Sequence, residues 1–342
     1  MGKSSNTSQR VMVAVDAMGG DFAPAEIVSG AVQAARDLGV EIILTGPRAE
    51  VESEMSEVDI TNLPVRLVEA SETIVDGEQP AMAVMRKPNS SMAIATRLVK
   101  EGEADAMISA GSTGAVMVCA LQYLGTLPGI ERPVAGGPFL GLSPKTVVLD
   151  LGANVGCQPY QMVNFAVIGS VYARSFLGID NPTVGLLNVG AEEGKGDDFA
   201  KEAYPLMKKS GLNFIGNVEG MDIVSGKVNV IVCDGFVGNI LVKFCEGLGR
   251  AVNHWLAGEL KEKLSPADLE SVTSKLYRLM SPGVVMGGGP LLGVDGVAAI
   301  AHGASRAPQI VGTIKQAMLA VESKFVATLR AELEKVQKTI ST

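Results

Sequence analysis

Small polar residues and one lysine follow the apolar runs of this sequence. They are Asp16, Asp21, Ser109, Ser112, Thr113, Asp150, Asn154, Asn188, Lys195, Asp234 and Asn239. Taken singly, each is more often a turn residue or a helix cap than a catalytic group. Taken together, they predict one rim of carboxylates, amides, hydroxyls and an ammonium group. Such a rim suits chemistry in which a bound anion, such as inorganic phosphate, itself attacks an activated acyl carbonyl.

Glycine-marked turns after short apolar runs indicate how these residues are positioned. The runs with their turns read AVDAMGGD, ILTGP, MISAGSTG, VVLDLGAN, GLLNVG, NFIGNVEG and VIVCDGFVGN. Continuous apolar runs separated by helix-length amphipathic stretches are typical of buried parallel strands in an α/β fold. In open α/β sheets, ligands bind where the carboxyl ends of the strands meet loops. Glycine lets backbone N–H groups approach an anion, and a helix N-terminus adds partial positive charge. The sequence therefore predicts an anion site.

The predicted strands and helices alternate along the chain. Strands are expected at 11–17, 40–45, 64–69, 106–109, 146–149, 184–187, 213–215 and 228–232, and helices follow most of them. The polar start predicts a disordered tail at 1–10, and 11–335 is interpreted as a single α/β/α catalytic domain.

A long helix is expected after Asp234, where one apolar stripe continues through Leu256. Ser265, Pro266 and Asp268 restart a helix with a capping pattern, so 236–281 is predicted to form a protruding helical hairpin. The residues assigned to its tip are Trp255, Leu256, Leu260 and Leu264. Two interpretations stay open for this hairpin: a dimer or hairpin interface, and an interfacial helix in contact with lipid.

Composition excludes several classes of protein. A formal charge of −8 argues against nonspecific nucleic-acid binding, which needs Lys and Arg to neutralise phosphates. The four cysteines lie far apart with no CxxC pair, which suits a reducing cytosol better than a disulfide framework or a zinc ribbon. With no run of 18 apolar residues and no signal peptide, a cytoplasmic protein is expected.

Familiar nucleotide and hydrolase motifs are missing. No GxGxxG follows a strand, and 190–195 reads GxxxGK, one residue short of a P-loop. HExxH and GxSxG are also missing, and the sequence has only His254 and His302. His302 in AHGAS is interpreted either as a proton donor or as a structural histidine.

An ordered series of motifs from about Val11 to Ala320 resembles one family. The motifs are MVAVDAMGGDFAP, SAGSTGA, GIERP, KTVVLDLGANVGC, LLNVGAEEGKG, VCDGFVGN and GGGPLLGVDGVAAIAHGAS. They are similar to those of the bacterial acyl-ACP:phosphate acyltransferases of phospholipid synthesis. The resemblance implies transfer of a fatty acyl group from acyl carrier protein to inorganic phosphate, and the acyl phosphate would feed a membrane glycerol-3-phosphate acyltransferase.

The same resemblance implies a three-layer α/β/α homodimer with a mostly parallel sheet, similar to isocitrate and isopropylmalate dehydrogenases and to phosphotransacetylases. It further implies no metal or nucleotide cofactor and a cytoplasmic protein that associates peripherally with the membrane. Three positions depart from the family pattern, namely Ser112, Ala191 and Gly156.

Most of the expected roles rest on residues that the family pattern retains, and Ser109, Ser112 and Thr113 are added from the polar residues that follow the apolar runs. Lys195, Asp234, Asn239 and His302 are assigned to catalysis. The residues assigned to phosphate or substrate binding are Asp16, Gly19, Gly20, Asp21, Ser109, Gly111, Ser112, Thr113, Asp150, Asn154 and Asn188. Two alternatives remain open: a decarboxylating NAD-type dehydrogenase on the same fold, and a noncatalytic membrane-associated scaffold.

Overall fold

A computed structural model describes residues 10–280 and 288–341, and its contacts divide this chain into two compact units. Within the described residues, unit 1 comprises 10–125, 288–290 and 295–323, and unit 2 comprises 126–280, 291–294 and 324–341. Nearly all of the predicted tail at 1–10 lies outside the described residues. The interpretation of 11–335 as one catalytic domain stays a prediction.

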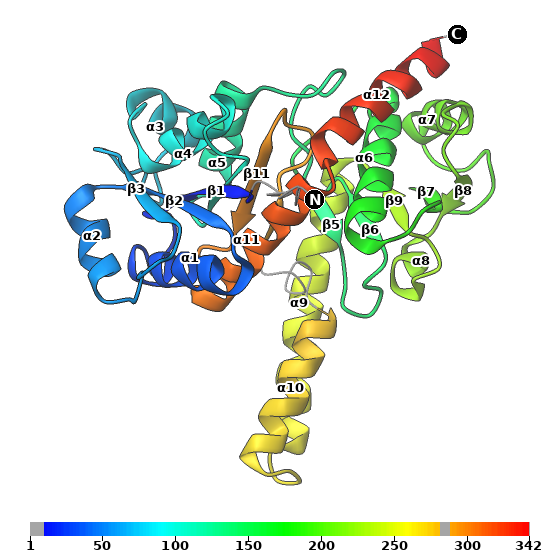
Figure 1. Cartoon of the computed structure of the whole chain (residues 1–342). Coiled ribbons are helices and arrows are strands. Elements are labelled where there is room, and N and C mark those ends of the chain that lie inside the picture. The colour runs from blue at the N-terminus through cyan, green and yellow to red at the C-terminus, as the bar shows by residue number, and fades with distance from the viewer. Residues whose placement is uncertain (1–9, 281–287, 342) are drawn as a thin grey trace, which may run out of the picture. The chain divides into compact units, whose positions relative to one another are not determined.

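Unit 1 is built on a mostly parallel sheet (Figure 1). Its described strands are β1 (Met12–Asp16), β2 (Glu41–Gly46), β3 (Val65–Glu69), β4 (Ala106–Ser109), β10 (Gly288–Pro290) and β11 (Val297–Ala301). Their order is β10-β11-β4-β1-β2-β3, and only the edge strand β10 runs antiparallel to its neighbour. The parallel register sets Val13 opposite both Ile42 and Ala106, so the carboxyl ends of β1 and β4 meet at one edge.

Helices cover both faces of the unit 1 sheet (Figure 1). They are α1 (Ala25–Leu38), α2 (Arg48–Ser56), α3 (Pro80–Arg86), α4 (Ser91–Lys100), α5 (Thr113–Cys119), the π-helical turn η1 (Ala120–Leu124) and α11 (Ala307–Glu322). Helix α1 packs against α11, while α4 contacts β1, β2 and β4. Gly30 permits the close contact between α1 and α11, because a Cβ there would lie 2.7 Å from the Cβ of Ile310 on α11.

Unit 2 has a separate sheet with the order β5-β6-β9-β7-β8. Its described strands are β5 (Gly136–Pro138), β6 (Val147–Leu149), β7 (Val184–Leu187), β8 (Phe214–Val218) and β9 (Val230–Val232). The four strands from β6 to β8 are parallel, and β5 is an antiparallel edge strand. The carboxyl ends of β6, β7 and β9 therefore face the same side, which is where the polar turns after them lie.

The unit 2 helices are α6 (Pro159–Leu177), α7 (Asp198–Lys209), α8 (Gly220–Ser225), α9 (Gly235–Leu260), α10 (Pro266–Met280) and α12 (Phe325–Ser341). Helix α6 packs between the sheet and α12, and all its residues from Gln161 to Ala173 are buried. Gly169 allows this, because a Cβ would lie 3.1 Å from Leu149 Cδ1 and would overlap Val230. A second core beneath α8 and α9 contains Phe139, Val148 and Ile231.

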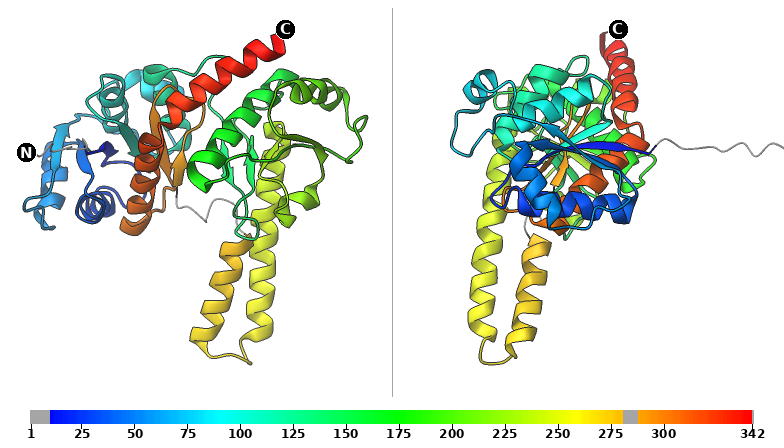
Figure 2. Two further views of the ribbon diagram at one scale, coloured as in Figure 1. Left: turned by 45° about the vertical axis from the view of Figure 1, so that its right-hand side comes forward. Right: turned by 60° about the vertical axis from the view of Figure 1, so that its left-hand side comes forward.

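Helices α9 and α10 pack against each other over the segment for which a hairpin was predicted (Figure 2). The restart is capped as expected, with the backbone N–H of Asp268 donating to Ser265 Oγ at 3.2 Å. The expected single apolar stripe divides, however: Leu241 packs on the unit 2 core, whereas the Phe244 and Trp255 side chains are 64% and 63% exposed. Among the described residues, no helix has the length and apolarity needed to cross a membrane.

Three strands were missing from the sequence-based expectation. β5 and β10 both read GGP, a composition that predicts a turn, and β11 has the short alanine-rich sequence VAAIA. Yet β11 is an inner strand of unit 1, with parallel β4 on one side and antiparallel β10 on the other. The helix that follows β4 is α5, and it continues as the π-helical turn η1 to Leu124.

Candidate active site

A buried carboxylate organises the strand ends of unit 1. Asp16 is the last residue of β1 and is 2% exposed, and its Oδ2 accepts a hydrogen bond from Ser109 Oγ at 2.6 Å. Burial raises the pKa of Asp16 even though hydrogen bonds from Ser109 and Ser91 oppose the shift. Ser109 Oγ in turn accepts the backbone N–H of Gly111 at 3.0 Å. These groups hold the turn after β4 against the turn after β1.

Glycines bring two predicted loops of unit 1 together. A Cβ at Gly19 would lie 2.6 Å from Gly111 N, so only glycine fits there. Gly20 has φ +107°, and the next N–H, of Asp21, donates to Gly303 O at 2.9 Å. His302 Nδ1 accepts the N–H of Ala304 at 3.1 Å, which leaves Nε2 as the nitrogen that carries a proton on the neutral ring.

The exposed members of this unit 1 group are Asp21, Thr113 and His302. Ser112 precedes α5 without a side-chain capping bond. The structure therefore places all the predicted unit 1 residues at the carboxyl ends of β1, β4 and β11 or in the segments that follow them. Asp16, Gly19 and Ser109 are buried, and Gly20, Gly111 and Ser112 are half-buried.

In unit 2, the Asp150 carboxylate holds the loop that follows it. The carboxylate is fully buried after β6, and it accepts backbone N–H groups from Gly152, Ala153 and Asn154 at 2.8–2.9 Å. The Asn154 side chain donates to Asp150 Oδ2 and to the carbonyl of Pro133. Burial raises the pKa of Asp150, while these donors oppose the shift. The side-chain polar atoms of Asp150 and Asn154 thus form the hydrogen bonds that hold the loop in place.

Asp234 joins two segments at the start of α9. Its Oδ1 accepts the N–H of Phe236 at 2.7 Å as the helix cap, and Oδ2 accepts the N–H of Cys157 at 2.7 Å. Asn239, one turn into the helix, is exposed and lies over Gly152, since a Cβ on that glycine would be 3.2 Å from Asn239 Cβ. Helix α9 therefore fixes the Asp150 loop and the 155–157 loop together.

Asn188 and Lys195 belong to one loop after β7. Asn188 Nδ2 donates to the Lys195 carbonyl at 3.0 Å, and Asn188 Oδ1 accepts the N–H of Val189 at 2.8 Å. The Lys195 side chain is exposed and, within the described part of the chain, forms no ion pair. Asn188 shapes the loop, and the lysine ammonium is left available.

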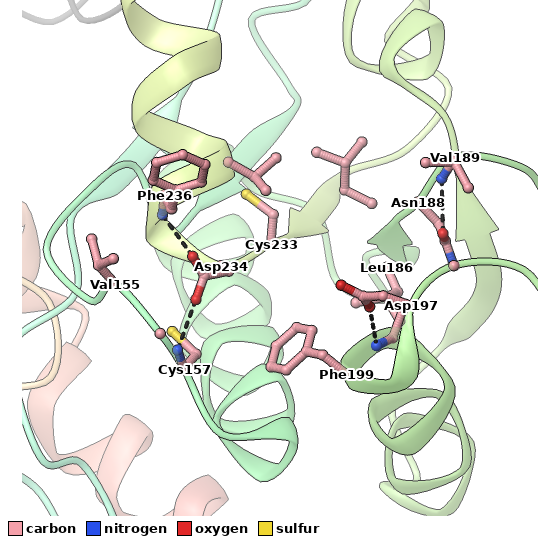
Figure 3. A pocket seen from close by; sticks show the side chains of 15 residues that line it. Val155, Cys157, Leu186, Asn188, Val189, Asp197, Phe199, Cys233, Asp234 and Phe236 are labelled. Carbon is pink, nitrogen blue, oxygen red and sulfur yellow. Dashed lines mark hydrogen bonds between the residues drawn. The ribbon is translucent and has the colours of Figure 1, made fainter.

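An apolar pocket of about 760 Å³ opens between these loops of unit 2 (Figure 3). Residues lining it include Val155, Cys157, Leu186, Asn188, Val189, Asp197, Phe199, Cys233, Asp234 and Phe236. Phe199 points into the space from α7, and Asp197 caps that helix by accepting the Ala200 N–H at 2.9 Å. The pocket size is ordinary for a small-molecule site.

The pocket thiols are not activated. Burial raises the pKa values of Cys157 and Cys233 to about 12, and nearby Asp234 acts in the same direction. A thiolate nucleophile needs the opposite, an electropositive and partly exposed setting. Across residues 10–280 and 288–341, no three His, Cys, Asp or Glu side chains gather as a metal site.

Comparison with known proteins identifies the family. A model described as "Fatty acid synthesis protein" matches residues 11–328. The chain is 43% identical over 332 residues to a phosphate acyltransferase of Pelotomaculum thermopropionicum, covering 95% of this chain and 96% of the relative. This chain belongs to the phosphate acyltransferase family.

Solved structures show the same fold at low sequence identity. The EutD phosphotransacetylase of Staphylococcus aureus matches with a TM-score of 0.63 at 19% identity, covering 92% of this chain and 94% of its own. A 4-hydroxythreonine-4-phosphate dehydrogenase of Klebsiella pneumoniae matches with a TM-score of 0.51 at 14% identity, covering 91% and 99%. The predicted α/β fold, shared with phosphotransacetylases and with a dehydrogenase, is confirmed, as is membership of an acyltransferase family.

For this phosphate acyltransferase family member, the predicted site residues fall into two groups, one in each unit. Unit 2 holds Asp150, Asn154, Asn188, Lys195, Asp234 and Asn239, and unit 1 holds the rest apart from the hairpin tip. Sequence reasoning missed the pocket residues Val189, Asp197, Phe199 and Phe236. Asp197 carried a usable signal, because it precedes an amphipathic helix at a capping position.

Proposed function

We propose that this protein transfers a fatty acyl group from acyl carrier protein to inorganic phosphate and releases acyl phosphate for phospholipid synthesis. The observation that carries the proposal is the 43% identity to a phosphate acyltransferase over almost the whole of both chains. A phosphate oxygen attacks the thioester carbonyl carbon, a C–O bond to phosphate forms, and the C–S bond breaks. The carrier thiolate leaves and takes up a proton.

The chemistry of the cysteines supports direct attack by phosphate. An acyl-enzyme route through cysteine needs a thiolate. Burial raises the pKa of Cys119, Cys157 and Cys233 to about 12 and also raises the pKa of Cys245. All four cysteines are therefore protonated at neutral pH, and the reaction proceeds without a cysteine thioester.

In the proposed mechanism the exposed polar groups act on the substrates. In unit 2, Lys195 offsets phosphate charge. In unit 1, the turn of Gly111, Ser112 and Thr113 is the candidate phosphate-binding turn, and His302 or a water protonates the leaving thiolate. Asn239 orients the reacting groups. Asp234 is a positioning residue, because both of its carboxylate oxygens hold backbone N–H groups.

The proposal includes a homodimer at the inner surface of the cytoplasmic membrane. The hairpin offers a surface for lipid contact, because apolar Trp255 is 63% exposed while Lys261 and Lys263 nearby are also exposed. The proposed partners are acyl carrier protein and a downstream membrane glycerol-3-phosphate acyltransferase. The family relationship favours acyl transfer over the NAD-type dehydrogenase and over a noncatalytic scaffold, since the dehydrogenase likeness concerns the fold alone.

One assay separates these functions. The protein is mixed with acyl-ACP and phosphate, and hydroxylamine traps acyl phosphate as a hydroxamate. Hydroxylamine also reacts slowly with the thioester itself, so we expect hydroxamate to rise above this background only when protein and phosphate are both present, and we expect labelled phosphate in the acylated product. Product that forms equally without phosphate, or reduction of NAD with a hydroxy diacid and no hydroxamate, contradicts the proposal.

A further inference from the structure

Three strongly exposed apolar side chains line the unit 2 pocket. Val189 is 82% exposed, Val155 65% and Phe236 59%, and all three line the same cavity of about 760 Å³. Val189 lies in the loop after β7, and Phe236 lies at the start of α9, which follows β9. Ligands bind at this edge of the sheet in open α/β folds. Clustered apolar side chains that stay open to solvent around a cavity mark a ligand site.

The charges in the pocket select the kind of ligand. Asp234 and Asp197 face the space from opposite sides (Figure 3). Both carboxylates are fixed by backbone N–H groups, at 2.7 Å for Phe236 and 2.9 Å for Ala200, so neither can swing away without uncapping a helix. Two fixed negative charges disfavour phosphate or another anion inside the pocket. A neutral apolar group meets no charge repulsion from these carboxylates.

The shape of the pocket wall also suits a chain. The Phe199 ring projects from α7 into the space, and Val155 and Phe236 lie on the other side of it (Figure 3). The side-chain polar atoms of Asn188, both carboxylate oxygens of Asp234 and Oδ1 of Asp197 already have partners within the protein. An apolar occupant that leaves Asp197 Oδ2 facing water therefore breaks none of these hydrogen bonds.

We infer that this pocket binds the hydrocarbon chain of the acyl donor, an inference that rests on the proposed acyl transfer for the identity of the ligand. A fatty chain must leave water when its thioester reacts, and each methylene that enters an apolar pocket tightens binding by up to about fourfold. The pocket then determines the specificity of the enzyme for acyl chain length.

The first test measures binding without turnover. Primary alcohols from hexanol to hexadecanol displace the neutral fluorophore N-phenyl-1-naphthylamine from the full-length protein. We expect affinity to rise with each methylene until the pocket is filled, and Val189→Glu to weaken dodecanol binding at least tenfold. The matched control is Ile215→Glu, because Ile215 is a β-branched residue of the same unit, 50% exposed and outside the pocket. Trp255→Ala serves as control for probe bound to the hairpin.

The second test uses the reaction. Val189→Glu is expected to lower kcat/KM for a sixteen-carbon donor at least tenfold more than for a four-carbon donor, whereas Ile215→Glu lowers both equally or not at all. Equal alcohol affinity in Val189→Glu and Ile215→Glu overturns the pocket assignment while acyl transfer stands. If no donor gives acyl phosphate, the proposed function fails, and the alcohol titration still decides whether the pocket takes hydrocarbon.

Discussion

Gly238 is the residue through which helix α9 meets the Asp150 loop. A Cβ at this position would overlap the Asp150 carbonyl oxygen, and it would lie 2.9 Å from the Asp150 carbonyl carbon and 3.0 Å from Leu151 Cα. All three atoms belong to backbone that buried hydrogen bonds hold in place. Gly238→Ala therefore forces α9 and the loop apart.

The cost follows from comparison with a glycine of the same helix. Gly247 has no atom within 4 Å of its constructed Cβ, so Gly247→Ala adds only helix propensity and stabilises by about 0.5–1 kcal/mol. Gly238→Ala gains a similar amount and loses about 3 kcal/mol to overpacking against backbone. The difference between the two variants isolates the clash. For a unit of about 150–250 residues it corresponds to roughly 6–12 °C in Tm.

Thermal unfolding followed by circular dichroism measures this difference. We expect Gly247→Ala to melt at or slightly above the wild type and Gly238→Ala well below both. At a temperature where both variants are folded, Gly238→Ala should also lose acyl-phosphate formation, because moving the start of α9 breaks the bond from the Cys157 N–H to Asp234. Equal melting temperatures for the two variants refute the close approach on which this reasoning depends.

Two further predictions concern the chemistry of the site. Because burial raises the pKa of Cys157 to about 12, its thiol stays protonated below that pH, and its thiolate fraction at pH 8 is on the order of 10⁻⁴. Cys157→Ala should therefore keep most of the wild-type turnover, and iodoacetamide should label Cys157 in the native protein only slowly, as measured by mass spectrometry. Loss of activity in Cys157→Ala would instead establish a role for the thiol. Lys195→Ala should lower turnover by about 10²–10³ with Tm unchanged, because the exposed ammonium supports no contact of the fold, and wild-type turnover in this variant removes Lys195 from the mechanism.

The strands that could be predicted are those whose own residues demand burial. β1, β2, β4 and β6 carry short apolar runs that include Val, Ile, Leu, Ala or Met, and their positions follow from the sequence within one or two residues. β5 and β10 form only because a neighbouring strand supplies hydrogen bonds at a sheet edge. Nothing in the local sequence GGP encodes that neighbour, so tertiary pairing decides the state of these segments.

The pocket could not be predicted from the sequence for a related reason. Its wall combines the 155–157 loop, the loop after β7 and the starts of α7 and α9, segments whose separation in the sequence carries no sign of their proximity. Val189 and Phe236 were read as parts of turn motifs, and their exposure became visible only with the fold. Single apolar residues in turns are ordinary on protein surfaces, so only their convergence on one cavity distinguishes these.

The polar residues at the strand ends form two groups, those that are buried and hydrogen-bonded within the protein and those that are exposed. Asp16, Asp150 and Asn154 are buried, and their side chains are engaged in hydrogen bonds within the protein, so replacing one of these groups costs stability before it affects chemistry. Lys195, Asn239 and His302 are exposed. Asn188 holds the loop that carries Lys195, Asn239 lies over Gly152 of the Asp150 loop, and the Asp21 N–H holds the Gly303 carbonyl beside His302. A group that contributes little to folding but is held in place by others that do is free to bind substrate. The exposed residues are therefore the ones to test for catalysis, and the buried carboxylates are groups that stabilise the fold.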